Sequence, residues 1–154
     1  ATLNRYIILA TSIFVSVLCS VNYAFGVWSQ ALKQYPRCYS QSDVDNIGTI
    51  GNVGQYLGIF AGLVYDRWGP KATLVCGAVL GSTGYFLLYF ALVGDLSVTP
   101  LELALVYAIG SNAQPFFDTS ALVTNIANFS TAKSLVIGLG KAFNGLGAGV
   151  YASL

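Results

Sequence analysis

The stretch "GLVYDRWGPKATLV", residues 62–75, places three charged side chains between two long apolar runs. Asp66, Arg67 and Lys71 lie within a single span of six residues. A helix needs about 20 largely apolar residues to cross a bilayer, and the runs on both sides of the cluster reach that length. The cluster is therefore predicted to be a tight turn at a membrane surface, between two spanning helices.

The whole chain has the composition of a membrane protein. Of its 154 residues, 55% are hydrophobic and 8% are charged, whereas a soluble domain carries about 25% charged residues. The formal net charge is +1, so no basic surface indicates nucleic acid as a partner. Histidine is absent, and the three cysteines have no disulfide or metal-ligand spacing. We therefore expect no enzyme activity, no metal and no cofactor.

Five apolar stretches are long enough to span a bilayer, and none alternates as a membrane barrel strand does. We expect an all-α, polytopic transmembrane bundle within residues 1–154, with helices at about 6–28, 44–65, 72–93, 101–127 and 135–154. Residues 29–43 are predicted to be a polar loop, and Thr99-Pro100 a helix start. Because the chain opens on Ala1 and stops inside an apolar stretch, we expect it to be part of a longer protein.

Basic residues near helix ends predict the orientation of a multi-pass membrane protein, since they concentrate on the cytoplasmic side. The six of them divide four to two between the sides: Arg5, Arg67, Lys71 and Lys133 against Lys33 and Arg37. The excess predicts that the amino end and the charged turn are cytoplasmic.

Asp118 and Lys141 lie inside the predicted fourth and fifth helices. A charge near the bilayer centre costs at least about 2.5 kcal/mol, so each is a candidate functional residue. Both lie about 10 to 15 Å from the cytoplasmic ends of adjacent antiparallel helices, so they are able to meet. Contact of Lys141 with an anionic solute and proton exchange by Asp118 are the functional interpretations. A structural ion pair, or a lysine that extends to the interface, stays open as an alternative.

The fourth apolar stretch, "GSNAQPFFDTSALVTN" at residues 110–125, is the most polar of the five. Pro115 is predicted to break it, because proline removes a backbone hydrogen bond, and interrupted helices with polar neighbours mark solute sites in transporters. Hydrogen bonding between helices is the alternative. The candidate residues of a solute path are Asn22, Asn112, Gln114, Asp118, Lys141 and Asn144.

The spacing Gly62-x-x-x-Asp66-Arg67-x-Gly69-x-Lys71 resembles the loop G-x-x-x-D-R-x-G-x-[KR] of the major facilitator superfamily, which follows the second helix. Three longer stretches are similar to the nodulin-like group of that superfamily: "YAFGVWSQALKQ" at 23–34, "IGTIGNVGQYLGIFAGLVYDRWGP" at 47–70 and "FFDTSALVTNIANFSTAKSLVIGLGKAFNGLGAG" at 116–149. The likeness runs along essentially the whole chain. Asp118 departs from the pattern of the nodulin-like group, since asparagine is more usual at this position.

The resemblance implies a secondary transporter of a small solute, with twelve or so helices in two halves that expose the solute to either side in turn. This chain would supply the first five helices. Its partners would be the lipid bilayer, the rest of the same chain and the solute, with a coupled proton as one version. Lys141 slightly favours an organic anion. The alternative is a membrane sensor or scaffold that keeps the fold without transporting.

The resemblance also implies a role for the charged turn. Its aspartate is expected to hold the two halves of the transporter together on the cytoplasmic face, where a carboxylate at a helix end gains about 0.3 to 1 kcal/mol from the helix dipole. The predicted conformational latch consists of Gly62, Asp66, Arg67, Gly69 and Lys71. The alternative is that the two basic residues only fix topology.

Overall fold

The computed structural model describes residues 2–34, 38–93 and 98–153, and in these residues all regular structure is helical. This confirms the predicted all-α fold. The elements are α1 (Thr2–Leu18), the 3-10 helix η1 (Cys19–Ala24), α2 (Phe25–Trp28), the 3-10 helix η2 (Ser29–Lys33), α3 (Gln41–Tyr56), α4 (Ile59–Val93), α5 (Pro100–Ser111), α6 (Ala113–Asn128) and α7 (Lys133–Ser153).

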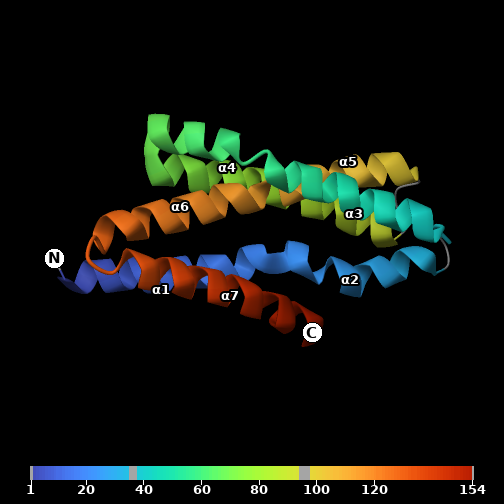
Figure 1. The fold of residues 1–154 in the computed structure, drawn as a ribbon. Coiled ribbons are helices and arrows are strands. Elements are labelled where there is room, and N and C mark those ends of the chain that lie inside the picture. The colour runs from blue at the N-terminus through green and yellow to red at the C-terminus, as the bar shows by residue number, and fades with distance from the viewer. Residues whose placement is uncertain (1, 35–37, 94–97, 154) are drawn as a thin grey trace.

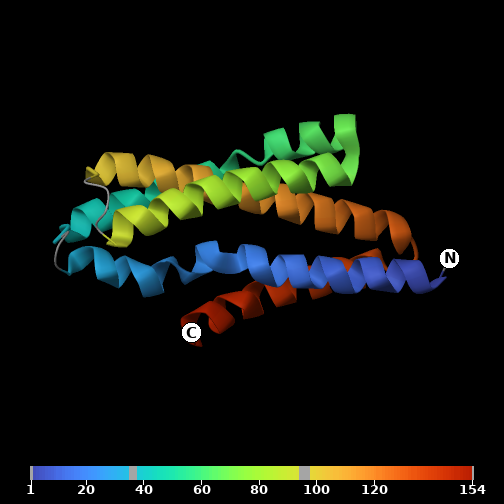
Figure 2. The same ribbon diagram turned by 180° about the vertical axis from the view of Figure 1, so that it is seen from behind.

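These elements form five helical segments that run back and forth along one long axis (Figures 1 and 2). The first comprises residues 2–33, the second 41–68, the third 70–93, the fourth 100–128 and the fifth 133–153. The start of α1, the bend within α4 and the connection from α6 to α7 lie at one end of the bundle. The end of η2, the start of α3 and the start of α5 lie at the other.

The first segment is longer than the sequence predicted. A polar loop was expected from Ser29, but the chain continues as η2 to Lys33. The reason is packing: Leu32 is fully buried in a core cluster with Ile47 of α3 and Leu103 of α5. Burying a leucine side chain is worth about 1.5 to 3 kcal/mol, which holds this extra turn against its neighbours.

Capping boxes fix the starts of α3 and α5. Ser40 and Asp43 exchange side-chain and backbone hydrogen bonds, so α3 begins at Gln41, slightly before the predicted start at residue 44. Thr99 and Glu102 do the same for α5. Since such boxes satisfy otherwise unpaired N–H groups of the first turn, they set each start. The predicted helix start at Thr99-Pro100 is confirmed.

A single residue, Gly69, reverses the chain between the second and third segments. Its φ of 79° and ψ of −177° are non-helical and lie where side chains are rarely tolerated. Thr73 Oγ1 donates to the Gly69 carbonyl at 2.9 Å, and Ser120 Oγ of α6 donates to the Pro70 carbonyl at 3.1 Å. The predicted turn is thus compact and tied to α6.

The segments pack in two layers. α1 lies beside α7, while α3 to α6 form the other layer, and α6 contacts both α4 and α1 (Figure 1). The third and fourth segments touch backbone to backbone, because a Cβ on Gly84 would overlap the Gly110 backbone. Such close approach between helices requires small residues.

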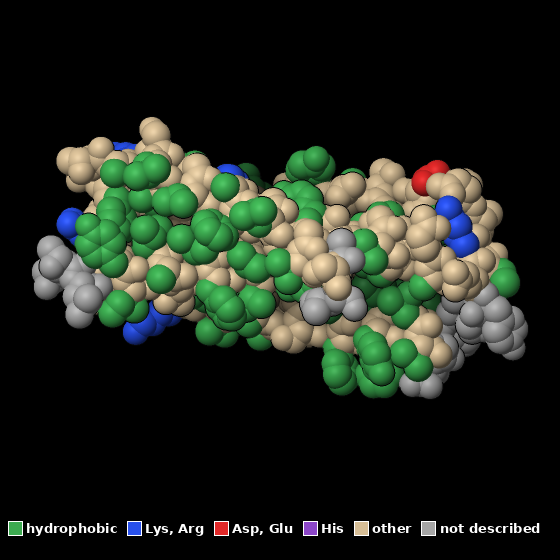
Figure 3. All heavy atoms as spheres, turned by 90° about the horizontal axis from the view of Figure 1, so that it is seen from below, with side chains coloured by type: hydrophobic (Ala, Val, Ile, Leu, Met, Phe, Trp, Pro, Cys, Tyr) green, Lys and Arg blue, Asp and Glu red, His purple; other side chains and the backbone are tan. Residues whose placement is uncertain are grey.

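The outer surface is rich in apolar side chains. Large exposed examples are Phe14, Ile59, Val75, Phe86 and Leu146. On the face shown in Figure 3, most lysine, arginine and acidic side chains lie toward the ends of the molecule and apolar ones lie between. Two stretches of the described residues, Asn4–Lys33 and Gln41–Val93, are long and apolar enough to cross a membrane. A surface of this kind suits a lipid environment.

Candidate functional site

Three helical segments are interrupted, and the interruptions contact one another. The first segment changes to a 3-10 helix over η1, the second turns at residues 57–58 between α3 and α4, and the fourth breaks at Asn112 between α5 and α6. Asn112 Nδ2 donates to the Gly54 carbonyl near the end of α3 at 2.5 Å. Tyr107 of α5 donates from its hydroxyl to the Asn22 carbonyl in η1 at 3.4 Å. Both carbonyls also accept a backbone N–H, from Leu57 and Phe25 respectively, so side chains of other segments add a second hydrogen bond at these breaks.

Pro115 does not break the fourth segment where the sequence predicted. The break is at Asn112, and Pro115 lies inside the first turn of α6, where its missing N–H removes no intrahelical bond of that helix. In a continuous helix, residue 115 would donate to the carbonyl of Ser111 four residues earlier. That carbonyl instead accepts from Asn22 Nδ2 at 3.3 Å. The proline therefore opens a backbone acceptor, which the first segment fills.

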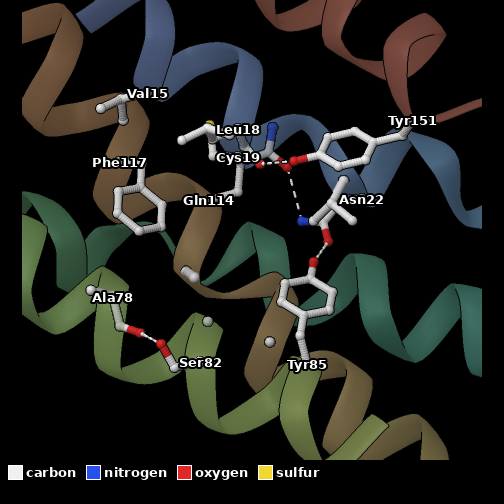
Figure 4. Close-up of a pocket in the computed structure, with 14 residues that line it drawn as sticks. Val15, Leu18, Cys19, Asn22, Ala78, Ser82, Tyr85, Gln114, Phe117 and Tyr151 are labelled. Atoms are coloured by element: carbon white, nitrogen blue, oxygen red, sulfur yellow. Dashed lines mark hydrogen bonds between the residues drawn. The ribbon is translucent and has the colours of Figure 1, made fainter. Parts of the chain in front are cut away.

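Asn22 is the centre of a buried network. It is 8% exposed, and its Nδ2 also donates to Gln114 Oε1 at 2.9 Å. Its Oδ1 accepts from Ser111 Oγ at 3.2 Å and from the Tyr85 hydroxyl. Gln55 Nε2 extends the network to the second segment by donating to Gln114 Oε1 at 2.5 Å. Figure 4 shows the Tyr85 hydroxyl and the Gln114 amide converging on Asn22 from different segments.

Asp118 and Lys141 meet, which the sequence left open. Lys141 Nζ lies 2.8 Å from Asp118 Oδ2, and Asn144 Nδ2 donates to Asp118 Oδ1 at 3.3 Å. The lysine side chain is 53% exposed and the aspartate side chain 19%, while Asn144 is buried. The structure thus brings three of the predicted solute-path residues into one cluster, with the carboxylate held from two sides and the ammonium facing open space.

This cluster borders a pocket of about 520 Å³ formed by the first, second, fourth and fifth segments. Its lining is mostly polar or aromatic: Tyr23, Asn52, Gln55, Tyr56, Gln114, Pro115, Asp118 and Lys141. The volume falls within the range of about 300 to 1,000 Å³ that small-molecule sites occupy. Gln114 lines the pocket and also belongs to the buried network, so its hydrogen bond to Asn22 fixes part of the pocket wall.

A second cavity, of about 410 Å³, lies on the other side of the same network (Figure 4). Its walls are largely apolar and come from the first, third and fourth segments, with Asn22, Tyr85 and Gln114 as polar members. Tyr151 of α7 also borders it and donates from its hydroxyl to the Leu18 carbonyl at 2.8 Å. The network therefore separates a polar pocket from an apolar one.

The predicted latch residues lie apart from both pockets, at the bend of α4. Asp66, Arg67 and Lys71 are exposed there, and Asp66 makes no ion pair with any residue in the described ranges. The Arg67 guanidinium lies 5.5 Å from the centre of the Trp68 ring. A side chain on Gly62 would meet nothing within 4 Å. The turn thus presents an unpaired carboxylate and two cations at the surface.

Sequence reasoning missed Tyr85, Tyr107 and Gln55. The two tyrosines lie in apolar stretches where aromatic residues are common, and nothing in their spacing distinguishes them. Gln55 could have been predicted from the sequence, because an amide inside a predicted spanning helix is a polar group that needs a partner. It carried the same signal as Gln114.

Comparison with known proteins identifies the family. Residues 5–154 match the profile of the Nodulin-like family. The chain belongs to the Nodulin-like family. This family is related to major-facilitator-type transporters, which supports a membrane transport role at the level of the family.

One curated relative is Protein NUCLEAR FUSION DEFECTIVE 4 of Arabidopsis thaliana, which is 20% identical over 148 residues. The match covers 96% of this chain and 25% of that protein, so the chain spans about a quarter of its relative. No solved structure matches this member of the Nodulin-like family.

The Asn22 contact with Ser111 predicts coupling between Asn22 and Pro115. Asn22→Ala should lower the free energy of unfolding by about 1 to 3 kcal/mol, because buried polar groups lose their partners. In a Pro115→Ala background the cost should fall by about 0.5 to 1.5 kcal/mol, since the alanine supplies the missing N–H to Ser111. Denaturant unfolding of the four purified full-length proteins in detergent measures this cycle.

The matched control is Asn46→Ala, because Asn46 is exposed and makes no side-chain hydrogen bond among the described residues. Its effect should be the same with and without Pro115. Strict additivity of Asn22→Ala and Pro115→Ala would show that the Ser111 contact contributes nothing.

Proposed function

We propose that this chain is the first part of a multi-pass secondary transporter, which moves a small solute by alternating access through the polar pocket. The observation that carries the proposal is an ion pair lining a solute-sized pocket between four segments. Interrupted helices around a midplane site are the usual construction of solute sites in secondary transporters. The family membership supports the same reaction class.

Lys141 supports a solute that carries a carboxylate group. Its ammonium has three N–H donors, of which one is directed to Asp118. The side chain is half exposed and lines the pocket. Donors that remain open in a polar pocket suit the oxygens of an organic acid.

Asp66 supports a conformational latch at the bend of α4. Its carboxylate is exposed and unpaired among the described residues, so it is available to the remainder of the full-length protein. Pairing with a basic residue or a helix end there would stabilise one of the two access states. The bend would be cytoplasmic, together with the start of α1 and the connection from α6 to α7, which lie at the same end.

Loss of the Lys141 ammonium should impair transport. We expect Lys141→Ala to lower uptake at least about tenfold, since a hydrogen bond to a charged group contributes about 1.5 to 3 kcal/mol. Full-length protein in proteoliposomes, screened against a panel of labelled organic acids and neutral solutes, gives the measurement. Lys133→Ala is the matched control, because Lys133 is exposed and borders no part of this pocket. Equal uptake by both variants would reduce Lys141 to a structural residue.

The orientation is testable with thiol labelling. Cys38 is exposed and lies two residues before Ser40, the N-cap of α3. The start of α3 lies at the end of the bundle opposite the bend of α4, so an impermeant maleimide should label Cys38 in sealed right-side-out vesicles. In a Cys38→Ser background, Lys71→Cys should be labelled only after permeabilisation. Ready labelling of Lys71→Cys from outside would reverse the topology.

Asp66→Asn should shift the balance between the two access states. A helix-end contact of about 0.3 to 1 kcal/mol corresponds to a change of about two- to fivefold. The rate at which external reagent labels Asn52→Cys in the pocket, in a Cys38→Ser background, should fall by that factor. Asp45→Asn, at an exposed site on α3, is the control. An unaltered labelling rate for Asp66→Asn would contradict the proposed latch.

A further inference from the structure

The charges of the polar pocket cancel. Of the described residues that line it, only Asp118 and Lys141 are charged, and they form an ion pair. A bare anion bound to Lys141 would leave the site with a net negative charge and would compete with Asp118 for the same ammonium. An uncompensated charge beside Asp118 is unfavourable, because the aspartate side chain is only 19% exposed. Charge balance therefore favours a solute whose own charges sum to zero.

The ion pair has spare hydrogen-bonding capacity on both partners. Lys141 uses one of its three ammonium donors on Asp118. Asp118 accepts one bond on each carboxylate oxygen, from Lys141 and from Asn144, and each oxygen has a second lone pair. Donors and acceptors thus remain at two points that are 2.8 Å apart.

Asn144 is a buried hydrogen-bond partner of the carboxylate. Its side chain is 2% exposed, and its Oδ1 has no hydrogen-bond partner among the described residues. A buried amide oxygen without a partner is costly. Asn144 also borders a hollow shared with Lys141 and Tyr23. Its amide thus fixes Asp118 Oδ1 through the 3.3 Å bond from Nδ2, and leaves the second lone pairs of the carboxylate for a ligand.

We propose that the solute is a zwitterion with its ammonium and carboxylate groups on one carbon, that is, a molecule of the α-amino acid class. The carboxylate would bind the free donors of Lys141, and the ammonium would bind Asp118. The complex keeps a net charge of zero. This assignment deepens the proposed transport function and rests on it.

The rest of the pocket suits the body of such a molecule. Tyr23 and Tyr56 line the pocket and are 57% and 83% exposed, so their rings are open to an apolar or aromatic side chain. Asn52 and Gln55 supply neutral hydrogen-bonding groups on the same wall. The volume of about 520 Å³ accommodates amino acids of any size.

Binding to the purified full-length protein tests the charge requirement with matched ligands. One set comprises L-phenylalanine, 3-phenylpropanoate and 2-phenylethylamine, and the other L-alanine, propanoate and ethylamine. Within each set the body is constant, and only the ammonium or the carboxylate is missing. We expect at least one amino acid to bind at least tenfold more tightly than both of its singly charged analogues, as measured by calorimetry.

Two variants should move the preference in opposite directions. Asp118→Asn leaves Lys141 without its counter-ion, so the affinity for the carboxylate analogue should rise relative to that for the amino acid. Lys141→Gln leaves Asp118 without its ion-pair partner, so the affinity for the amine analogue should rise relative to that for the amino acid. Asp45→Asn and Lys133→Gln are matched controls at exposed positions outside the pocket, and both should keep the wild-type order. Thermal unfolding of each variant establishes that it is folded.

The proposal is overturned if the carboxylate analogue binds wild-type protein as tightly as the amino acid, if neither set binds, or if folded variants keep the wild-type order. Uptake assays on the same protein separate this failure from that of transport. Uptake of an organic acid without amino acid binding would overturn the zwitterion and leave the transporter. Amino acid binding without any uptake would support the zwitterion but overturn the transporter, and would favour a sensor.

Discussion

The arrangement of the site depends on one backbone carbonyl. Pro115 has no N–H to offer the Ser111 oxygen, and Asn22 donates to it from the first segment. A buried carbonyl without a donor costs about 1 to 3 kcal/mol, so this contact determines where the first and fourth segments meet. Tyr85, Ser111 and Gln114 then converge on the same amide. The polar pocket lies on one side of that junction and the apolar cavity on the other.

Polar residues in this chain therefore do two different jobs. Asn22 and Asn112 join broken helices by binding backbone carbonyls, which is the interhelical hydrogen bonding that the sequence kept open as an alternative. Asp118 and Lys141 instead border open space. Burial distinguishes the two groups: Asn22 is 8% exposed, whereas the Lys141 side chain is 53% exposed. Only the second group has capacity left for a ligand.

The sequence predicted features that depend on local chemistry. The helix start at Thr99-Pro100 follows from a capping box, and the charges in the fourth and fifth segments stood out because charge is rare in apolar stretches. It predicted a break in the fourth segment but placed it at Pro115, three residues after the observed one at Asn112. It did not predict the break at residues 57–58, because that position lies in a glycine-rich apolar run. Nor did it predict Tyr85 as a partner of Asn22, since that contact depends on how distant segments pack.

The bond from Ser120 to the Pro70 carbonyl has a mechanical consequence. Ser120 lies two residues after Asp118 on the same helix, and Thr124 of that helix also contacts the Tyr65 hydroxyl at 3.1 Å. α6 therefore carries the pocket carboxylate and also hydrogen-bonds to both sides of the Gly69 bend, through Thr124 to Tyr65 and through Ser120 to Pro70. One continuous helix thus connects the pocket carboxylate with both sides of the bend beside Asp66.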